Sequence, residues 1–210
     1  MEKRVYFVRH GQSVANRDGV LGGKDTLLSE TGQEQAARVA ERCEYIDFDT
    51  LIASDFVRAQ ETAAPIAAAK NLPIITNPLF GEFFEASEFN GLTETDPAVV
   101  AYRTERNDNV VSNPTWSYAD GETVSAFMLR LEAAKRCLEE IESSSVLVVS
   151  HAFFIQGFLS SILLNSYVPS REWLHAIQTF QHSNTGVSML RYSEGKWSVV
   201  MFNDHAHFAE

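Results

Sequence analysis

The chain has 210 residues, of which 45% are apolar and 21% are charged, and its formal net charge at pH 7 is −11. This length suits one domain with a full hydrophobic core, and this composition excludes a disordered chain. The acidic balance argues against a nucleic-acid partner, because a phosphate backbone is bound by clustered lysine and arginine.

The sequence carries no signal for a membrane or for secretion. No apolar run approaches the roughly 20 residues that span a bilayer. The N-terminus has charged residues but no apolar run before Arg9 and His10, so it does not resemble a signal peptide. We therefore expect a cytoplasmic protein without membrane contact, in which Cys43 and Cys137 are reduced.

Predicted strands and helices alternate along most of the chain. Short β-branched or apolar runs predict strands at 5–8, 50–53, 74–76 and 145–150. Helical spacing of apolar residues predicts helices at 29–42, 55–71, 122–142 and 153–164. In the second of these helices, Pro65 is expected to start, kink or divide the helix.

Two further regions interrupt or end this alternation. Residues 79–120 are aromatic and rich in turn residues, and we expect an insertion over one end of the sheet, with a helix near 97–106. Residues 187–192 and 197–202 flank a turn and predict a terminal hairpin. The whole pattern predicts a single α/β domain over residues 1–210 with a mostly parallel central sheet.

Three of the predicted strands lead into residues that suit phosphate chemistry. One strand ends at Arg9 and His10, another ends at His151, and Arg58 follows the strand at 50–53 by one helical turn. Ligands of parallel sheets bind beyond the carboxyl ends of the strands, so we expect these four side chains along one sheet edge.

Histidine and arginine together indicate phosphoryl transfer. A neutral imidazole is a nucleophile near neutral pH, and the guanidinium fork matches phosphate oxygens. A helix that opens after the Arg9–His10–Gly11 loop would add backbone N–H donors. A lone histidine at a strand end is more often structural, but two histidines with two arginines at one edge favour a site.

The sequence Arg9–His10–Gly11–Gln12–Ser13, with Asn16 beyond it, resembles the signature of the histidine phosphatase superfamily, also called the phosphoglycerate mutase-like family. The resemblance continues in order along nearly the whole chain. The matching segments are Thr31–Gly32 with Gln35–Ala36, Ser54 with Arg58–Ala59 and Thr62, Gly121–Glu122–Thr123 with Arg130, Val149–Ser150–His151, Asn184, and Asn203–Asp204 with His207.

This resemblance implies a three-layer α/β/α sandwich and a phosphohistidine mechanism that needs no metal or other cofactor. It implies that His10 is the nucleophile. The residues that it places at the phosphate or the substrate are Arg9, Ser13, Asn16, Arg58, His151 and Ala152, where Ala152 stands at a position that is usually glycine in the family.

The general acid is the point at which the sequence departs from the family pattern. The family commonly has a glutamate followed by Phe-Gly, and no Phe-Gly follows at the usual distance here. We expect Glu82 to be the acid, with Glu85 as its rival, because Phe83 and Phe84 would favour a protonated carboxyl. The alternative is that these glutamates only solvate an exposed loop.

Several functions remain open at this stage. We expect a phosphatase that acts on small-molecule phosphate monoesters. A mutase of the phosphoglycerate type is the alternative, but residues 79–120 contain eight acidic residues against only Arg103 and Arg106, which disfavours a strongly anionic co-substrate. A catalytically inactive binding module is a third possibility. His205 and His207 superficially resemble a metal site, although no acid or cysteine cluster accompanies them.

Overall fold

The computed structural model describes residues 2–208. Its centre is a six-stranded sheet in the order β3-β2-β4-β1-β5-β6. The first four strands in this order run parallel, and β5 and β6 join them antiparallel, so the expected mostly parallel sheet and terminal hairpin are confirmed. The strands are β1 Lys3–Arg9, β2 Thr50–Ala53, β3 Ile74–Thr76, β4 Ser145–Ser150, β5 Val187–Ser193 and β6 Lys196–Asp204.

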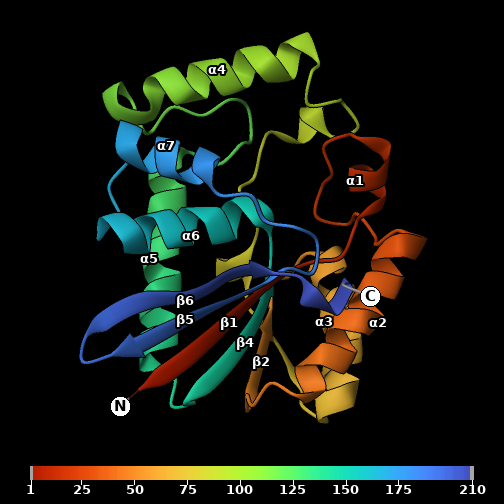
Figure 1. Ribbon diagram of the computed structural model, residues 1–210. Helices are drawn as coiled ribbons and strands as arrows, with labels where there is room; N and C mark the ends of the chain where they lie inside the picture. The colour runs from red at the N-terminus through yellow and green to blue at the C-terminus, as the bar shows by residue number, and fades with distance from the viewer. Residues whose placement is uncertain (1, 209–210) are drawn as a thin grey trace.

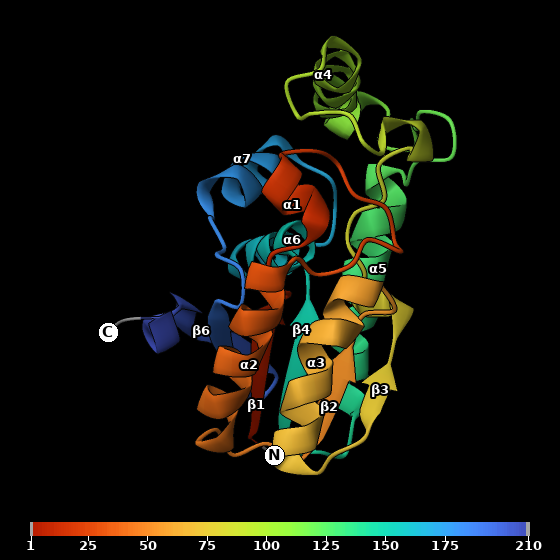
Figure 2. The same ribbon diagram turned by 90° about the vertical axis from the view of Figure 1, so that its right-hand side faces the viewer.

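Helices cover both faces of this sheet, which confirms the three-layer α/β/α architecture. Figures 1 and 2 show α2 and α3 on one face and α5 and α6 on the other. The helices are α1 Val14–Asp18, α2 Glu30–Glu44, α3 Val57–Lys70, α4 Pro97–Ser112, α5 Val124–Glu140, α6 Ala152–Leu164 and α7 Arg171–Thr179.

Strand β4 shows why the sheet lies between two helical layers. All of its residues are buried. Side chains alternate between the two faces of a strand, and here Val146 and Val148 belong to the core under α5 and α6. Leu147 and Val149 belong to the opposite core, under α2 and α3. An uninterrupted apolar run is what a strand buried on both faces requires.

Helix α3 excludes two of the three outcomes expected at Pro65. Pro65 lies inside the helix, so it neither starts nor divides it. Proline removes a single N–H from the helical ladder. On either side of it, Ala63 and Ile66 are fully buried in the core between α3 and the sheet. This packing holds the helix together across the missing hydrogen bond.

The insertion at 79–120 lies above the carboxyl ends of the parallel strands, where Figure 1 shows α4. Helix α4 extends beyond the expected 97–106, because Val110 near its end is buried in the main core. Phe80 and Phe83, near the start of the insertion, also belong to the main core, while Phe89, Val99 and Tyr102 form a small core within the insertion. The insertion is therefore joined to the main core at two places and forms a roof over the sheet edge.

Helix α7 was not expected from the sequence. The Ser170 hydroxyl accepts a hydrogen bond from the Trp173 N–H and caps its first turn. Trp173 and Ile177, one helical turn apart, are buried against α6 and α5.

Among residues 2–208, the structure contains no helix long and apolar enough to cross a membrane. Cys43 and Cys137 are both free thiols.

Candidate active site

His10 follows the carboxyl end of β1 in a tightly packed loop. The Gly11 N–H donates to the Thr62 hydroxyl at 3.0 Å, and the Asn184 amide donates to the His10 carbonyl at 2.9 Å. A Cβ atom on Gly11 would lie 2.5 Å from the carbonyl oxygen of Gly32 at the start of α2. Only glycine allows this approach, so the loop is locked between α2, α3 and the segment before β5.

The hydrogen bonds of His10 leave one ring nitrogen available to attack phosphorus. Nδ1 lies 2.7 Å from the Gly11 carbonyl oxygen, which can only accept, so Nδ1 carries the hydrogen. Nε2 therefore has the lone pair and accepts from Arg58 Nε at 3.1 Å. Burial, followed by the positive charges of Arg58 and Arg9, holds the pKa of His10 well below 6.5. The ring is neutral at pH 7, as a nucleophile requires.

Two arginines flank this nitrogen. Arg58 is buried and also donates to the Gly23 carbonyl at 2.8 Å, and its burial lowers its pKa to about 10, so it remains charged. Arg9 donates to the carbonyl of His182, and its Nε is buried without a hydrogen-bond partner among residues 2–208. A buried donor without a partner is costly. These guanidinium groups are placed to receive an anion.

His151 follows β4 and lies directly beside His10. The two ring centroids are 5.1 Å apart, and Nε2 of His151 lies 2.8 Å from the Ser54 hydroxyl. Phe56 contacts the ring from another side, with centroids 4.7 Å apart. Within the described chain, Nδ1 of His151 is buried without a partner. Burial, then nearby positive charge, lowers the pKa of His151 well below 6.5.

Three other residues named from the sequence lie at the same cleft. The Ser13 hydroxyl accepts the Asn16 N–H at 3.1 Å, and the Asn16 side chain accepts the Ser13 N–H at 3.2 Å. This reciprocal pair is the capping box of α1. Ala152 is the first residue of α6, after His151 at the N-cap, and it also borders the cleft. A helix N-terminus directs N–H groups and positive potential at that point.

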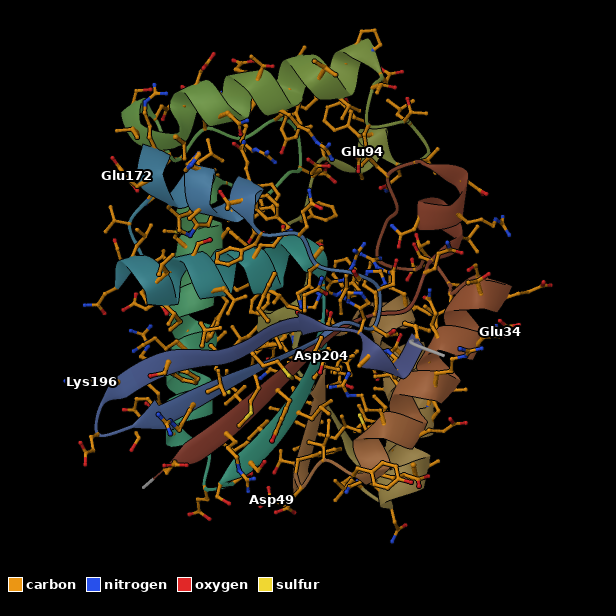
Figure 3. All side chains as sticks on the ribbon, in the orientation of Figure 1. Glu34, Asp49, Glu94, Glu172, Lys196 and Asp204 are labelled. Carbon is orange, nitrogen blue, oxygen red and sulfur yellow. The ribbon has the colours of Figure 1, made fainter. Side chains whose placement is uncertain are left out.

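The cleft has a volume of about 580 Å³ and continues from His10 toward α4 and α7. Figure 3 shows side-chain nitrogens gathered between the start of α6 and the segment around α1, and it labels Glu94, which lines the far side. Beyond the residues already described, the cleft is lined mainly by aromatic, amide and charged side chains: Phe83, Phe84, Glu85, Phe89, Arg103, Arg106, Asn107, Phe153, Gln156, Leu174 and Gln178.

Glu82 lies between the two ends of this cleft. Its carboxylate accepts N–H groups from Phe83 and Phe154 at 3.0 Å and from Phe153 at 3.2 Å. Phe153 and Phe154 belong to the first turn of α6, whose N-cap residue, His151, makes no side-chain cap. Burial raises the pKa of Glu82, outweighing these hydrogen bonds and the charges of Arg58 and Arg9.

Glu85 is held differently. It forms a two-pronged ion pair with Arg103, at 2.8 and 2.9 Å, and a weaker contact with Arg106 at 3.3 Å. The Arg106 guanidinium is buried among aromatic rings, 5.2 Å from the centroid of Phe83 and 5.6 Å from that of Phe153. The Glu85 carboxylate is therefore held by arginine side chains, whereas the Glu82 carboxylate is held by backbone N–H groups.

Several residues that support this site had no role assigned to them from the sequence. Ser54 bonds to His151, Thr62 to Arg58, and Asn184 to His10, and all three lie in the motifs named above. The carbonyl of His182, which accepts from Arg9, was not identified from the sequence. His182 precedes β5 and has no local pattern that would mark it. Its ring is buried against the Ser188 hydroxyl at 3.0 Å.

The pair His205 and His207 is not arranged as a metal site. His207 lies 3.2 Å from an Arg42 nitrogen through Nδ1 and 3.1 Å from the Thr185 hydroxyl through Nε2, while His205 Nδ1 bonds to the Asn203 carbonyl. In the part of the chain that the structure describes, no three histidine, cysteine or acidic side chains come together as metal ligands.

Two histidines and Arg9 at the ends of parallel strands, with Arg58 from α3 beside them, form a site suited to an enzyme that acts on phosphate esters. The family model of the histidine phosphatase superfamily, branch 1, matches residues 5–205. The chain belongs to this superfamily.

Its relatives include both mutases and phosphatases by name. A probable phosphoglycerate mutase from an Enterobacter species is 31% identical over 201 residues, covering 92% of this chain and 87% of that protein. A putative alpha-ribazole-5′-P phosphatase from Escherichia coli has the same fold, with a TM-score of 0.79, 23% identity and 96% of each chain covered. A phosphoserine phosphatase from Entamoeba histolytica has a TM-score of 0.78, 20% identity and 98% of each chain covered.

Proposed function

We propose that the protein is a phosphatase that hydrolyses small-molecule phosphate monoesters through a phosphohistidine at His10. The observation that carries this proposal is the state of the His10 ring. Its Nδ1–H is bound to the Gly11 carbonyl, and its Nε2 lone pair faces the Arg58 guanidinium at 3.1 Å. A phosphoryl group that replaces this contact meets a neutral nucleophile and a fixed positive charge together.

In the first step, the His10 Nε2 lone pair forms a bond to phosphorus, and the bond between phosphorus and the ester oxygen breaks. Arg9, Arg58 and His151 bind the phosphoryl oxygens, using donors that are unpaired or weakly paired in the free protein. The electron pair of the broken bond stays on the leaving oxygen, which takes the proton of Glu82. The alcohol then departs with this proton.

In the second step, water attacks the phosphorus of the phosphohistidine. Glu82, now a carboxylate, accepts a proton from this water. The bond between phosphorus and nitrogen breaks, and its electron pair returns to Nε2. Inorganic phosphate leaves, and both His10 and Glu82 are restored. No metal or other cofactor takes part in either step.

The charge of the cleft favours hydrolysis over a mutase reaction. A mutase of the phosphoglycerate type must retain a bisphosphorylated intermediate, which is strongly anionic. The end of the cleft away from His10 has Glu85 and Glu94 beside Arg103 and Arg106, and Glu85 is bound to both arginines. Little uncompensated positive charge remains for a second phosphate.

The mutase remains the second candidate, because the relative at 31% identity is named a probable phosphoglycerate mutase. The experiment that separates the two supplies 3-phosphoglycerate with a bisphosphoglycerate primer and follows phosphorus species by NMR. We expect at most slow release of inorganic phosphate. Rapid isomerisation without phosphate release would reverse the order of the two functions. If phosphate release is the main reaction, a panel of phosphorylated metabolites assayed for phosphate release would identify the substrate.

A further inference from the structure

The ion pair between Arg130 and Glu122 lies outside the phosphate pocket, yet it holds the segment that carries Glu82. Arg130 comes from α5, and Glu122 precedes that helix. Its Nε donates to one carboxylate oxygen at 2.9 Å and a terminal nitrogen to the other at 2.7 Å. Both side chains are mostly buried, at 17% and 15% exposed, so solvent screens this pair little.

The rest of the Arg130 guanidinium is bound to the backbone of the insertion. It donates to the carbonyl oxygens of Leu79, Gly81 and Glu82 at 3.2, 2.7 and 3.1 Å. With the two bonds to Glu122, all five N–H donors of the guanidinium are used. Three backbone carbonyl groups within residues 79–82 are thus fixed to one side chain.

Glu122 completes this clamp from the other side. Its backbone N–H donates to the Phe84 carbonyl at 2.7 Å, and its carboxylate accepts the Phe84 N–H at 3.4 Å. The guanidinium also packs on Phe127 and Phe154, at 4.9 and 5.8 Å from the ring centroids. Phe154 is the residue whose N–H binds the Glu82 carboxylate.

From these contacts we propose that Arg130 and Glu122 are positioning residues for the general acid. The clamp fixes the backbone of Glu82, and the first turn of α6 fixes its carboxyl group. Together they hold the proton donor at the leaving-group oxygen. This inference rests on the proposed function, since it assumes that Glu82 protonates the leaving group.

The test compares two esters with leaving groups of similar size. The p-nitrophenolate ion leaves readily without a proton, whereas the alkoxide of benzyl phosphate needs one. The quantity compared is kcat/KM. It reports only substrate binding and the phosphorylation of His10, because release of the alcohol is the first irreversible step. For Arg130→Gln we expect a loss of about a hundredfold on benzyl phosphate and only a severalfold loss on p-nitrophenyl phosphate. Glu122→Gln, which keeps an acceptor oxygen, should show the same selectivity to a smaller extent.

Two comparisons separate positioning from a general structural role. In the double variant Arg130→Gln/Glu82→Gln, the loss on benzyl phosphate should exceed that of Glu82→Gln alone by no more than the severalfold loss seen on p-nitrophenyl phosphate, since the clamp then has no acid to position. Arg136→Gln, in an exposed i,i+4 pair with Glu132 on the same helix, should change neither ester.

The failures of this proposal and of the proposed function are distinguishable. Equal losses on both esters in Arg130→Gln and Glu122→Gln, or additive losses in the double variant, would overturn the positioning role while the phosphohistidine mechanism stands. Absence of phosphohistidine in the wild-type protein would overturn the proposed function, and the positioning role with it.

Discussion

The two ends of the cleft are built in opposite ways. At the phosphate end, Arg9, His10 and His151 come directly from the ends of adjacent parallel strands, and polar atoms of Arg9 and His151 are buried without partners within residues 2–208. At the other end, Glu85 and Arg103 come from the insertion and satisfy each other. The strand ends therefore carry polar groups that are free to bind an anion. In the insertion, the charges of Glu85 and Arg103 are already neutralised by each other.

From this difference we propose that the chemistry takes place at the phosphate end and that the other end sets the preference for one ester over another. Groups on strand ends are held rigidly, and their unpaired donors gain most when a phosphoryl group arrives. The insertion presents aromatic and amide side chains to the leaving group, so changes there should alter which ester is preferred. Glu82 belongs to the insertion in sequence but bonds to the first turn of α6, which directly follows β4 and His151, so it connects the two ends.

The largest effect is expected at the phosphate end. Arg58→Lys should lower kcat/KM about a thousandfold on every ester, because a point charge cannot replace the planar fork beside His10 Nε2. Steady-state assays of p-nitrophenyl and benzyl phosphate measure it. Arg38→Lys, an arginine away from the cleft on α2, is the control and should leave both rates unchanged. A selective loss on one ester in Arg58→Lys would contradict the division between the two ends.

A smaller and selective effect is expected at Glu82. Glu82→Gln should lower kcat/KM about a hundredfold on benzyl phosphate and much less on p-nitrophenyl phosphate, because only the alkoxide requires a proton. Glu85→Gln is the matched control, since it keeps its shape near the same cleft but is bound by Arg103. Selective loss in Glu85→Gln with near-normal Glu82→Gln would move the acid to Glu85. Equal losses on both esters in both variants would place the acid elsewhere.

The buried histidines predict a pH dependence of stability. Burial lowers the pKa of His182 to about 4, and His10 and His151 are lowered in the same direction. The unfolded chain therefore binds protons more readily than the folded protein below pH 6.5. The free energy of unfolding is therefore not reduced by these histidines above pH 6.5. It decreases as the pH falls toward 4, by about 3 kcal/mol for His182.

Urea unfolding at a series of pH values measures this effect. The free energy of unfolding should decrease between pH 6.5 and 4, and the decrease should be smaller in His182→Gln. The exposed His175 on α7 provides the control, and His175→Gln should follow the wild-type curve. A His182→Gln curve parallel to the wild type would show that His182 is not held neutral by the fold.

Local patterns predicted most of the fold, and long-range contacts explain what they left out. The apolar run of β4 and the β-branched start of β1 identify buried strands, and the strand ends place His10 and His151 together. Of the three outcomes expected at Pro65, a helix start and a division of the helix are excluded, and the buried packing on either side of the proline accounts for the continuous helix. Helix α7 has a cap at Ser170 and apolar residues one turn apart, but these signals are few in nine residues.

The surroundings of the acid could not be predicted in this way. Glu82 binds the N–H groups of residues 71 and 72 positions further along the chain, and Arg130 binds carbonyls about 50 positions earlier. Such hydrogen bonds have no period in the sequence. The choice between Glu82 and Glu85 therefore depends on tertiary contacts, while the family signature alone could indicate Arg9, His10, Arg58 and His151.

The most direct test of the mechanism is a rapid-quench reaction with phosphorus-labelled p-nitrophenyl phosphate, followed by peptide mapping of the trapped protein. We expect acid-labile, base-stable phosphate on His10 of the wild-type protein, formed at least as fast as turnover. His10→Ala should remain folded, hold no label and show no turnover. Full activity in His10→Ala, or label on another residue in the wild type, would contradict a phosphohistidine at His10.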